Sequence, residues 1–481
     1  MNVRAALAVV AVALSACAPP RPAGPPAPIA SQIDTLAIRA HTFFLADDLL
    51  LGRGTGTPGA DLAALYIESQ CRALGLRPLE RGYRLPVPLD EITFRPEETW
   101  LSVGGQRFTW FEDFLVTGGT PRALHGFRGA AVIVGSADDV RRDGDRLPRL
   151  DGRVAVISGV ARADVAAILA RQGAVGIVQV VGDEDGYRSY AASRGRTLTM
   201  HRDTAVTSSF HPDVPAVLVG PDVLAALQAP GAEVEVSAAF ERRPIRAENV
   251  ACLLPGTDRA RGDTVIAFTA HHDHLGVSVP DSSGDEIYNG FSDNAAGVAM
   301  LLAIADALQR SPAGGFAYGA LFLFFTAEER GLFGSDYFVA RPTWPLERIR
   351  AVINLDAGAP PARPWAWRVA GGEDTPLGAL ARDVAAEHGW GVTLSPATPN
   401  SDYFPFARMG VPAVFLIPGS APYQGLSADS SQALRRRWDR YHQPADAYHD
   451  DFPFSGIQRY AEFALRLAEA LDGGSRRPPP R

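Results

Sequence analysis

Three apolar runs in the second half of the chain lead directly into residues that bind metals or protons. TVIAFTA (264–270) precedes His271, His272, Asp273 and His274; ALFLFFTA (320–327) precedes Glu328 and Glu329; and AVINLDA (351–357) contains Asp356. Carboxylates that follow such runs lie near the buried edge of a sheet, where unpaired charge costs free energy. The pattern favours a fold in which cations neutralise these carboxylates.

The same runs predict the fold class. Continuous apolar strands separated by helical segments are typical of an α/β protein whose mainly parallel sheet is covered on both faces. The 481 residues are too many for one ordinary core, so we expect at least two domains. Residues 32–80 carry helical spacing, whereas 85–245 contain further strand-like runs at 130–134, 154–157, 176–180 and 214–219. His201 and His211 are isolated in that second region and are predicted to be surface or loop residues.

Composition excludes several functions. Hydrophobic residues make up 46% and charged residues 21% of the chain, as in globular proteins, and the net charge of −8 provides no basic surface for nucleic acid. Gly54, Gly56 and Gly59 match a dinucleotide-binding pattern, but they follow a helical segment and enclose Pro58, which indicates a loop. No G-x-S-x-G motif at a strand–helix turn supports a serine hydrolase.

The N-terminus reads as an export signal. An apolar run from Ala5 to Leu14 is too short to span a bilayer, and it ends in LSAC, which resembles a bacterial lipoprotein signal with Cys17 as the lipidated residue. A plain secretory signal is the alternative. Residues 18–31 form a Pro-rich linker, and 473–481 form a tail expected to be disordered. Cys71 and Cys252 are left, either as a disulfide or as two buried thiols.

Two further candidates join the residues at the strand ends. Asp293 opens the helical segment GFSDNAAGVAMLLAIADAL, and His442 lies in RYHQPADAYHD. Each carboxylate alone has an ordinary structural role, such as capping a helix or complementing its dipole. Together, two histidines and three carboxylates suit zinc, and two adjacent ions can clamp an attacking water and a substrate oxygen. Of the neighbouring Glu328 and Glu329, one would bind metal and the other would take a proton from the water.

The motifs AHHDHLG, NGFSDNAAGVA, FTAEERGLFGS, VINLDA and RYHQPAD occur here in the order found in a known family. The chain resembles the co-catalytic di-zinc aminopeptidases, which include secreted bacterial leucyl-type aminopeptidases and glutamate carboxypeptidase relatives. The resemblance covers residues 32–84 and 246–470, and it implies a three-layer zinc-exopeptidase domain over 32–84 and 246–472. RLDGRVAVISG and ARQGAVGIVQV resemble a protease-associated (PA) domain, so residues 85–245 would be a β-rich inserted domain. Residues 1–17 would be the signal peptide.

The resemblance also implies a role for each site residue. One zinc ion would be bound by His271, Asp293 and Asp356, and the other by Asp293, Glu329 and His442. Asp273 would orient the imidazole of His271, Glu328 would be the general base, and His272 and His274 would not be ligands. Ser292 stands where many members carry a non-bridging Asp, and Tyr403 replaces the His of an S-D-H segment near the substrate pocket.

The implied activity is hydrolysis of the N-terminal bond of peptide substrates. Carboxypeptidase or dipeptidase activity is the alternative within the family. A glutaminyl cyclase or a non-catalytic scaffold would agree less well with the complete set of ligands. The protein would act after export, at the periplasmic face of a bacterial membrane or the cell surface as a lipoprotein, or else as a secreted enzyme. The sequence leaves the oligomeric state and the preferred side chain open.

Overall fold

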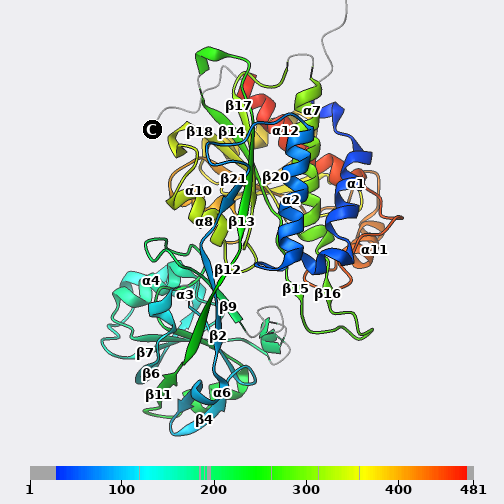
Figure 1. The fold of residues 1–481 in the computed structure, drawn as a ribbon. Coiled ribbons are helices and arrows are strands. Elements are labelled where there is room, and N and C mark those ends of the chain that lie inside the picture. The colour runs from blue at the N-terminus through cyan, green and yellow to red at the C-terminus, as the bar shows by residue number, and fades with distance from the viewer. Residues whose placement is uncertain are drawn as a thin grey trace, which may run out of the picture.

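The structure is a computed structural model that describes residues 29–473 except 119, 184, 185, 189, 192–196, 262, 312, 313 and 357. The expected signal with Cys17, most of the linker and most of the tail lie outside the described residues. The chain forms two bodies (Figure 1): an α/β body made of residues 29–86 and 247–473, and an inserted body made of residues 87–246.

The α/β body begins with η1 Ile29–Gln32, α1 Thr35–Leu45, η2 Asp48–Arg53, α2 Pro58–Ala73 and β1 Arg84–Pro86. After the insertion its first half contains β13 Glu248–Leu254, β14 Val265–His271, β15 Gly276–Val277, β16 Ile287–Tyr288, η7 Phe291–Ala295, α7 Ala296–Arg310, β17 Gly319–Phe325 and α8 Phe333–Ala340. Its second half contains β18 Ile349–Leu355, β19 Ala366–Ala370, α9 Pro376–Glu387, β20 Gly391–Ser395, α10 Tyr403–Arg408, β21 Ala413–Pro418, α11 Ala428–Trp438 and α12 Ser455–Gly473.

The large sheet of this body has the strand order β1-β13-β17-β14-β18-β21-β19-β20. Its centre, β17-β14-β18-β21, is parallel, whereas β13 and β19 join it in antiparallel pairs. The predicted α/β fold with a mainly parallel, mixed sheet is confirmed. All seven residues of β14 are buried, as the continuous apolar run required.

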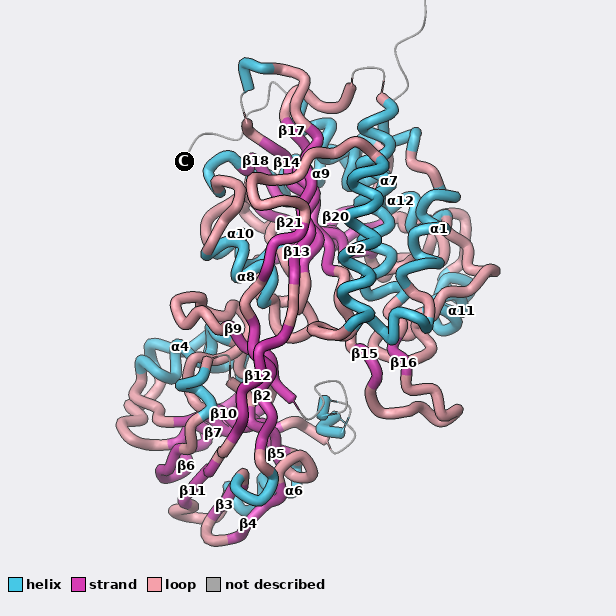
Figure 2. The backbone as a smooth tube through the Cα atoms, viewed as in Figure 1, coloured by secondary structure: helices cyan, strands magenta, loops and turns pink. Residues whose placement is uncertain are grey.

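Alternating side chains of the central strands enter two separate cores. Ile266, Phe268 and Ala270 of β14 pack with α1, α2, α7, α9 and α12, whereas Val265 and Ala267 pack with α8 and α10. This period of two divides the body into three layers, which Figure 2 shows with the larger helical layer on the right of the sheet. Within the described residues, one helical segment, Phe291–Arg310, is long and apolar enough to cross a membrane, and it is 89% buried as the central helix of this layer.

Local sequence explains where the first helices begin and end. The side chain of Asp34 caps α1 by accepting a hydrogen bond from the N–H of Leu36 at 2.8 Å. Pro58 lies in the first turn of α2, where its missing N–H costs nothing. Gly75, with φ of +67°, follows α2 and allows the left-handed turn that ends it. Gly54 and Gly56 lie in the connection between the helices, as predicted, whereas Gly59 lies in the first turn of α2.

The inserted body contains an eight-stranded sheet with the order β4-β3-β11-β6-β7-β8-β10-β5 and a three-stranded sheet β12-β2-β9. Its strands are β2 Leu89–Phe94, β3 Trp100–Val103, β4 Gln106–Thr109, β5 Phe114–Val116, β6 Phe127–Ser136, β7 Val154–Ser158, β8 Gly176–Val180, β9 Thr197–His201, β10 Ala216–Val219, β11 Glu233–Ser237 and β12 Phe240–Ile245. The helices α3 Ala137–Asp143, α4 Ala163–Arg171 and α6 Pro221–Leu227 accompany them. Antiparallel β2 and β12 lead to and from the α/β body.

His211 lies in a loop, one of the two predicted alternatives, whereas His201 is the last residue of β9, and neither is a surface residue. Both are buried, because the inserted body packs there against the segment that follows β17. The ring of His201 meets Phe333 edge-on at 4.8 Å, and the Nε2 of His211 lies 2.6 Å from the carbonyl oxygen of Arg330. A histidine isolated in sequence carries no sign that a segment more than 100 residues away will cover it.

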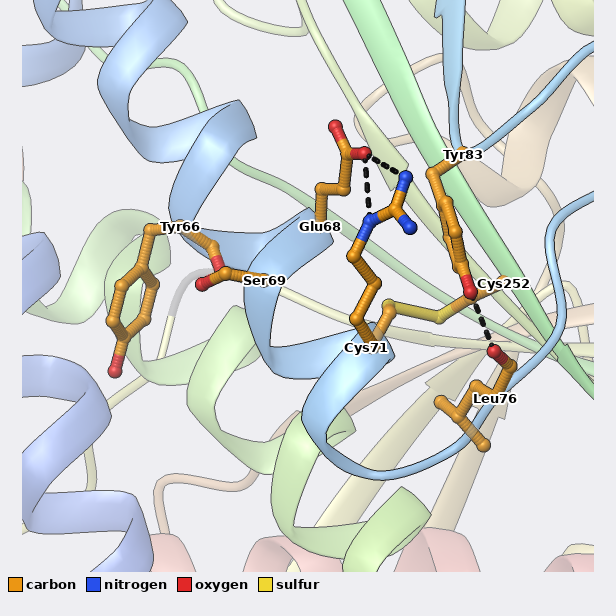
Figure 3. The surroundings of a disulfide bond; sticks show 8 residues. Tyr66, Glu68, Ser69, Cys71, Leu76, Tyr83 and Cys252 are labelled. Carbon is orange, nitrogen blue, oxygen red and sulfur yellow. Dashed lines mark hydrogen bonds and ion pairs between the residues drawn. A yellow bond between two sulfur atoms is a disulfide. The ribbon is translucent and has the colours of Figure 1, made fainter.

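Cys71 of α2 and Cys252 of β13 form a disulfide across 181 residues (Figure 3). The bond joins the helical layer to the sheet and lies in the larger core. Beside it, the hydroxyl of Tyr83 donates to the carbonyl oxygen of Leu76 at 2.7 Å. Of the two alternatives that the sequence left open, the structure shows the disulfide.

We predict that breaking this disulfide lowers the unfolding temperature of the α/β body. Closing a loop of this length restricts the unfolded chain and is worth about 3–5 kcal/mol. Thermal unfolding would be followed with and without reductant, in the parent and in the double variant Cys71→Ala/Cys252→Ala. Reductant should destabilise the parent and leave the variant unchanged. Equal unfolding temperatures for parent and variant without reductant would contradict the prediction.

Candidate metal centre

The candidate residues converge at the carboxyl ends of three neighbouring parallel strands. His271 is the last residue of β14, Asp356 directly follows β18, and Glu328 follows β17 after two residues. In open α/β sheets this edge is where ligands bind. The central position of β14 between β17 and β18 places His271 between the carboxylates that the other two strands deliver.

The first donor group consists of His271, Asp293 and Asp356. The Nε2 of His271 lies 3.0 Å from Oδ1 of Asp293 and 3.0 Å from Oδ1 of Asp356. The opposite nitrogen, Nδ1, lies 3.0 Å from the carbonyl oxygen of Asp273. When Nδ1 carries the proton for that hydrogen bond, the lone pair of Nε2 faces the two carboxylates and is free to bind a cation.

The second donor group shares Asp293 with the first. The Nε2 of His442 lies 3.1 Å from Oδ2 of Asp293 and 3.2 Å from Oε2 of Glu329. His274 joins this group, with its Nδ1 2.6 Å from Oε1 of Glu329. The ligand atoms of each group lie within 4.8 Å of one another. The two oxygens of Asp293 thus face one histidine each.

A tight turn before α7 presents Asp293 to both histidines. The peptide bond between Asp293 and Asn294 is cis, and the N–H of Asp293 donates to the carboxylate of Asp446 at 3.3 Å. The side chain of Asn294 donates to the carbonyl oxygen of Leu355 at 3.0 Å, which ties the turn to the end of β18. Gly290 has φ of +59°, and a Cβ there would lie 2.2 Å from the carbonyl oxygen of Asp293. The backbone N–H of Ser292 also binds Asp446.

The contacts of Asp273 differ from those that the resemblance implied. Its carboxylate lies 3.7 Å from Nδ1 of His271, beyond hydrogen-bonding distance, and its backbone carbonyl holds that nitrogen instead. The carboxylate accepts from the N–H of Glu328 at 3.1 Å and from the hydroxyl of Thr55 at 2.9 Å. Asp273 therefore orients His271 through its main chain and Glu328 through its side chain.

Glu328 lies beside the donor groups without belonging to either. Its Oε2 is 4.0 Å from Nε2 of His271. Burial raises the pKa of its carboxyl well above the usual range, with the charges of Asp356 and Glu329 adding to the rise against the opposing effect of His271. It stands in a turn where Ala327 and Leu332 have φ of +57° and +65°, a costly conformation that surrounding contacts must maintain.

The electrostatics of the second group favour a cation. Burial disfavours the charged imidazole of His442, but Glu329 and Asp293 outweigh it and raise its pKa to about 10. Burial likewise opposes ionisation of Glu329, and the repulsion of Asp293 adds to this, yet His442 and His274 hold its pKa at about 2. The carboxylates thus attract positive charge strongly, and a divalent ion can supply it in place of protons.

Arg53 is a site residue that the sequence analysis missed. Its fully buried guanidinium lies behind the centre and donates to backbone carbonyls of Leu45, His272, Asn289 and Gly290. Burial lowers its pKa to about 10, against the opposing charge of Asp273 and Asp293, so it stays charged at neutral pH. The only signal was an arginine between glycines, which does not reveal that four distant carbonyls meet there.

Three neighbouring polar residues support Asp356 from behind. The hydroxyl of Ser401 donates to Oδ2 of Asp356, Asn354 donates to Ser401 at 2.7 Å, and Thr269 donates to Asn354 at 2.6 Å. Tyr403, which replaces a histidine of the family pattern, is fully buried, and its hydroxyl donates to the carbonyl oxygen of Thr398 at 3.0 Å. It packs beneath the site and its hydroxyl is engaged there.

The fold is similar to that of two bacterial aminopeptidases, one of which is named a zinc aminopeptidase. The structure is similar to an aminopeptidase from Aneurinibacillus sp. strain AM-1, with a TM-score of 0.59 and 21% identity, over 94% of this chain and 98% of the other. It is also similar to BSAP, a zinc aminopeptidase from Bacillus subtilis, with a TM-score of 0.52 and 19% identity, over 92% and 96% of the two chains. At these identities the likeness establishes the fold.

The sequence is similar to a peptidase family over the part that carries the centre. Residues 249–468 match the model of peptidase family M28. A probable lipoprotein aminopeptidase, LpqL of Mycobacterium tuberculosis, is 26% identical over 370 residues. That match covers 75% of this chain and 66% of the relative, slightly less than two thirds of its length.

We predict that the neighbours His272 and His274 respond differently to replacement by leucine. His274→Leu removes the contact to Glu329 and should weaken zinc retention about 10- to 100-fold, as losses of supporting hydrogen bonds do. His272 is equally buried, but burial keeps its pKa near 3, and His272→Leu should keep its zinc. Zinc per chain would be measured after equilibration with competing chelators. Equal losses in both variants would remove any special role of His274.

Proposed function

We propose that the protein is an aminopeptidase that uses two zinc ions. His271, Asp293 and Asp356 would hold one ion, and Asp293, Glu329 and His442 the other, with Asp293 shared. The observation that carries the proposal is the pair of donor groups that meet at Asp293, beside a buried Glu328 that belongs to neither. The domain of residues 32–84 and 246–472 would provide all of these groups.

Bound zinc would lower the pKa of the attacking water and stabilise negative charge on the carbonyl oxygen. Glu328 would accept the proton of this water while the water attacks the scissile carbonyl carbon. Its raised pKa makes it able to keep the proton and then donate it to the departing amine as the C–N bond breaks. The N–H of Glu328, held by Asp273, would keep the carboxylate aligned through both transfers.

The loaded centre would accept a substrate with a free amine. Asp293, Glu328, Glu329 and Asp356 gather at one strand edge, and two zinc ions would balance their four negative charges. An unprotonated α-amine could bind such an ion through its nitrogen lone pair, whereas an acetylated amine could not. The relative LpqL is itself named a probable aminopeptidase, in agreement with this preference.

Export and domain organisation complete the proposal. The signal would be cleaved before Cys17, and Cys17 would remain as a lipidated anchor at a bacterial membrane; LpqL is likewise named a lipoprotein. Residues 85–245 would be a PA-like domain. Its contacts with Arg330 and with Asp336, whose carboxylate accepts from the N–H and hydroxyl of Ser209 at 2.6 and 2.5 Å, place it beside the turn that carries Glu328.

A peptide panel tests the activity. Zinc-loaded protein would be given peptides with free N-termini, the same peptides N-acetylated, and peptides that end in C-terminal glutamate, each with and without chelator. Cleavage of free-amine peptides only, abolished by chelator, is expected. Cleavage of the blocked or glutamate-terminated peptides would show a carboxypeptidase. Absence of hydrolysis by a zinc-loaded protein would favour a cyclase or a scaffold.

We predict that Glu328→Gln retains zinc and loses about 10²–10⁴-fold in kcat, since loss of a general base typically costs that much. The amide keeps the shape of the side chain but cannot take a proton. Peptide turnover and zinc content would be measured together, with the exposed Glu347→Gln in the same body as the control. A Glu328→Gln enzyme with near-normal turnover would exclude the proposed base.

A further inference from the structure

Exposed apolar side chains are concentrated on one face of the α/β body. Fifteen large apolar residues are exposed in the described part of the chain, and nine of them lie on α1, η2, α2 and the segment that begins with β15. We call these nine the apolar face: Leu36, Phe43, Phe44, Leu49, Leu51, Leu62, Leu65, Val277 and Val279. Leu49 is 82% exposed and Leu36 is 73% exposed. Single exposed leucines are ordinary, but such a concentration marks a surface that is covered in use.

The face is continuous across its elements. Leu36 and Phe43 are seven residues apart on α1, and Leu62 and Leu65 are three apart on α2, so each pair shares one side of its helix. The ring of Phe44 stacks on Tyr66 of α2 at 4.1 Å and links the two helices. The turn of η2 packs against the main chain at Gly276, the first residue of β15. Both views show α1 and α2 on the right of the sheet and the β15–β16 hairpin below their lower ends.

These residues are not part of the core. The opposite side of α1, with Ile38 and Leu45, is buried in the larger core together with α7. The exposed residues therefore form a second apolar side on a helix that has already buried its first. Other contacts of the described chain leave this second side open to solvent.

The start of the described chain indicates what covers the apolar face. η1 lies directly before α1, and the N–H of Ile29 donates to Glu469 at 2.8 Å, which fixes this start against α12. Only the eleven residues 18–28 separate Ile29 from Cys17, and six of them are proline. Such a linker spans at most about 35 Å at ~3.1 Å per residue. A lipid on Cys17 would therefore keep the apolar face, which starts seven residues after Ile29, within reach of the bilayer.

We propose that the apolar face docks on the surface of the membrane that holds the lipidated N-terminus. The face would insert its leucines and phenylalanines into the headgroup region as a second attachment. Its charged neighbours include Asp47, Asp48 and Asp61 together with the single cation Arg39 of α1, so apolar burial and not attraction to anionic lipid would drive the docking. Because η2 continues through Arg53 to the centre, docking would bring the proposed peptidase site close to the lipid surface. The inference concerns binding and does not depend on the activity.

Vesicle binding tests the proposal. With Cys71 and Cys252 bonded, a chain that begins at Cys17 has one free thiol, which can be coupled to a maleimide phospholipid in neutral phosphatidylcholine vesicles. The coupled protein should protect α1 and η2 from hydrogen exchange or from a water-soluble quencher. The uncoupled protein should also sediment with vesicles, with little change between low and high salt, since salt screens only charge.

Variants distinguish binding through the apolar face from non-specific binding to the vesicles. Leu49→Asp/Leu51→Asp should raise the lipid concentration for half-binding by roughly tenfold or more, because two inserted side chains are lost. Met409→Asp and Ile133→Asp replace side chains that are 51% and 57% exposed, close to the 49% of Leu51, and should bind like the parent. Circular dichroism and zinc content would show that each variant is folded. If Leu49→Asp/Leu51→Asp does not fold, Leu49→Ser/Leu51→Ser would be tested in its place.

Four outcomes would overturn the proposal. The first is a parent protein that shows no protection even when coupled to the vesicle. The second is a pair of η2 variants that bind as the controls do. The third is a lipid-free parent that sediments as a dimer while Leu49→Asp/Leu51→Asp is monomeric, which would assign the face to a contact between two copies of the chain. Binding lost at high salt would point to charge and would also contradict the proposal.

Discussion

The carboxylate of Asp293 is the point on which the centre depends. Its two oxygens lie 3.0 Å from His271 and 3.1 Å from His442, residues that are 171 positions apart in the chain. No regular helix or strand presents a carboxylate in both directions from a sheet edge. The turn at η7 does so, held by Asp446 on one side and by Leu355 on the other. The start of α7 and the end of β18 are therefore fixed relative to each other by the site itself.

So many buried carboxylates require positive charge close by. Arg53 supplies part of it from behind, since its guanidinium stays charged while its N–H groups bind carbonyls and not the carboxylates. The carboxylate oxygens therefore keep their contacts with the histidines and form no bond to Arg53. A lysine could not reach four carbonyls with its three donors, and the planar guanidinium can. Arg53 thus offsets part of the negative charge of the centre without binding the ligand atoms.

The strands and the family pattern were predictable because both depend on local sequence. Continuous apolar runs gave β14, β17 and β18, and the order of the motifs indicated the family whose model residues 249–468 match. The metal ligands and the general base stay predictions, although the structure brings the named side chains together. What local sequence could not give were contacts between distant segments. Examples are the contact of Arg53 with Gly290 and that of His211 with Arg330. In each pair, the local sequence around one residue contains no pattern that predicts the other residue as its partner.

These distant contacts link the inserted body to the centre. His211 binds the carbonyl oxygen of Arg330, the residue after Glu329, and a Cβ on Gly331 would lie 2.4 Å from its ring. On the other side, Asp273 binds the N–H of Glu328. The turn that carries both glutamates, in which Ala327 and Leu332 adopt costly left-handed conformations, is thus held by contacts from both bodies. The inserted body lies between β1 and β13 and is far in sequence from the end of β17. In the fold it nevertheless contacts the turn after β17, whose geometry the proposed proton transfer needs.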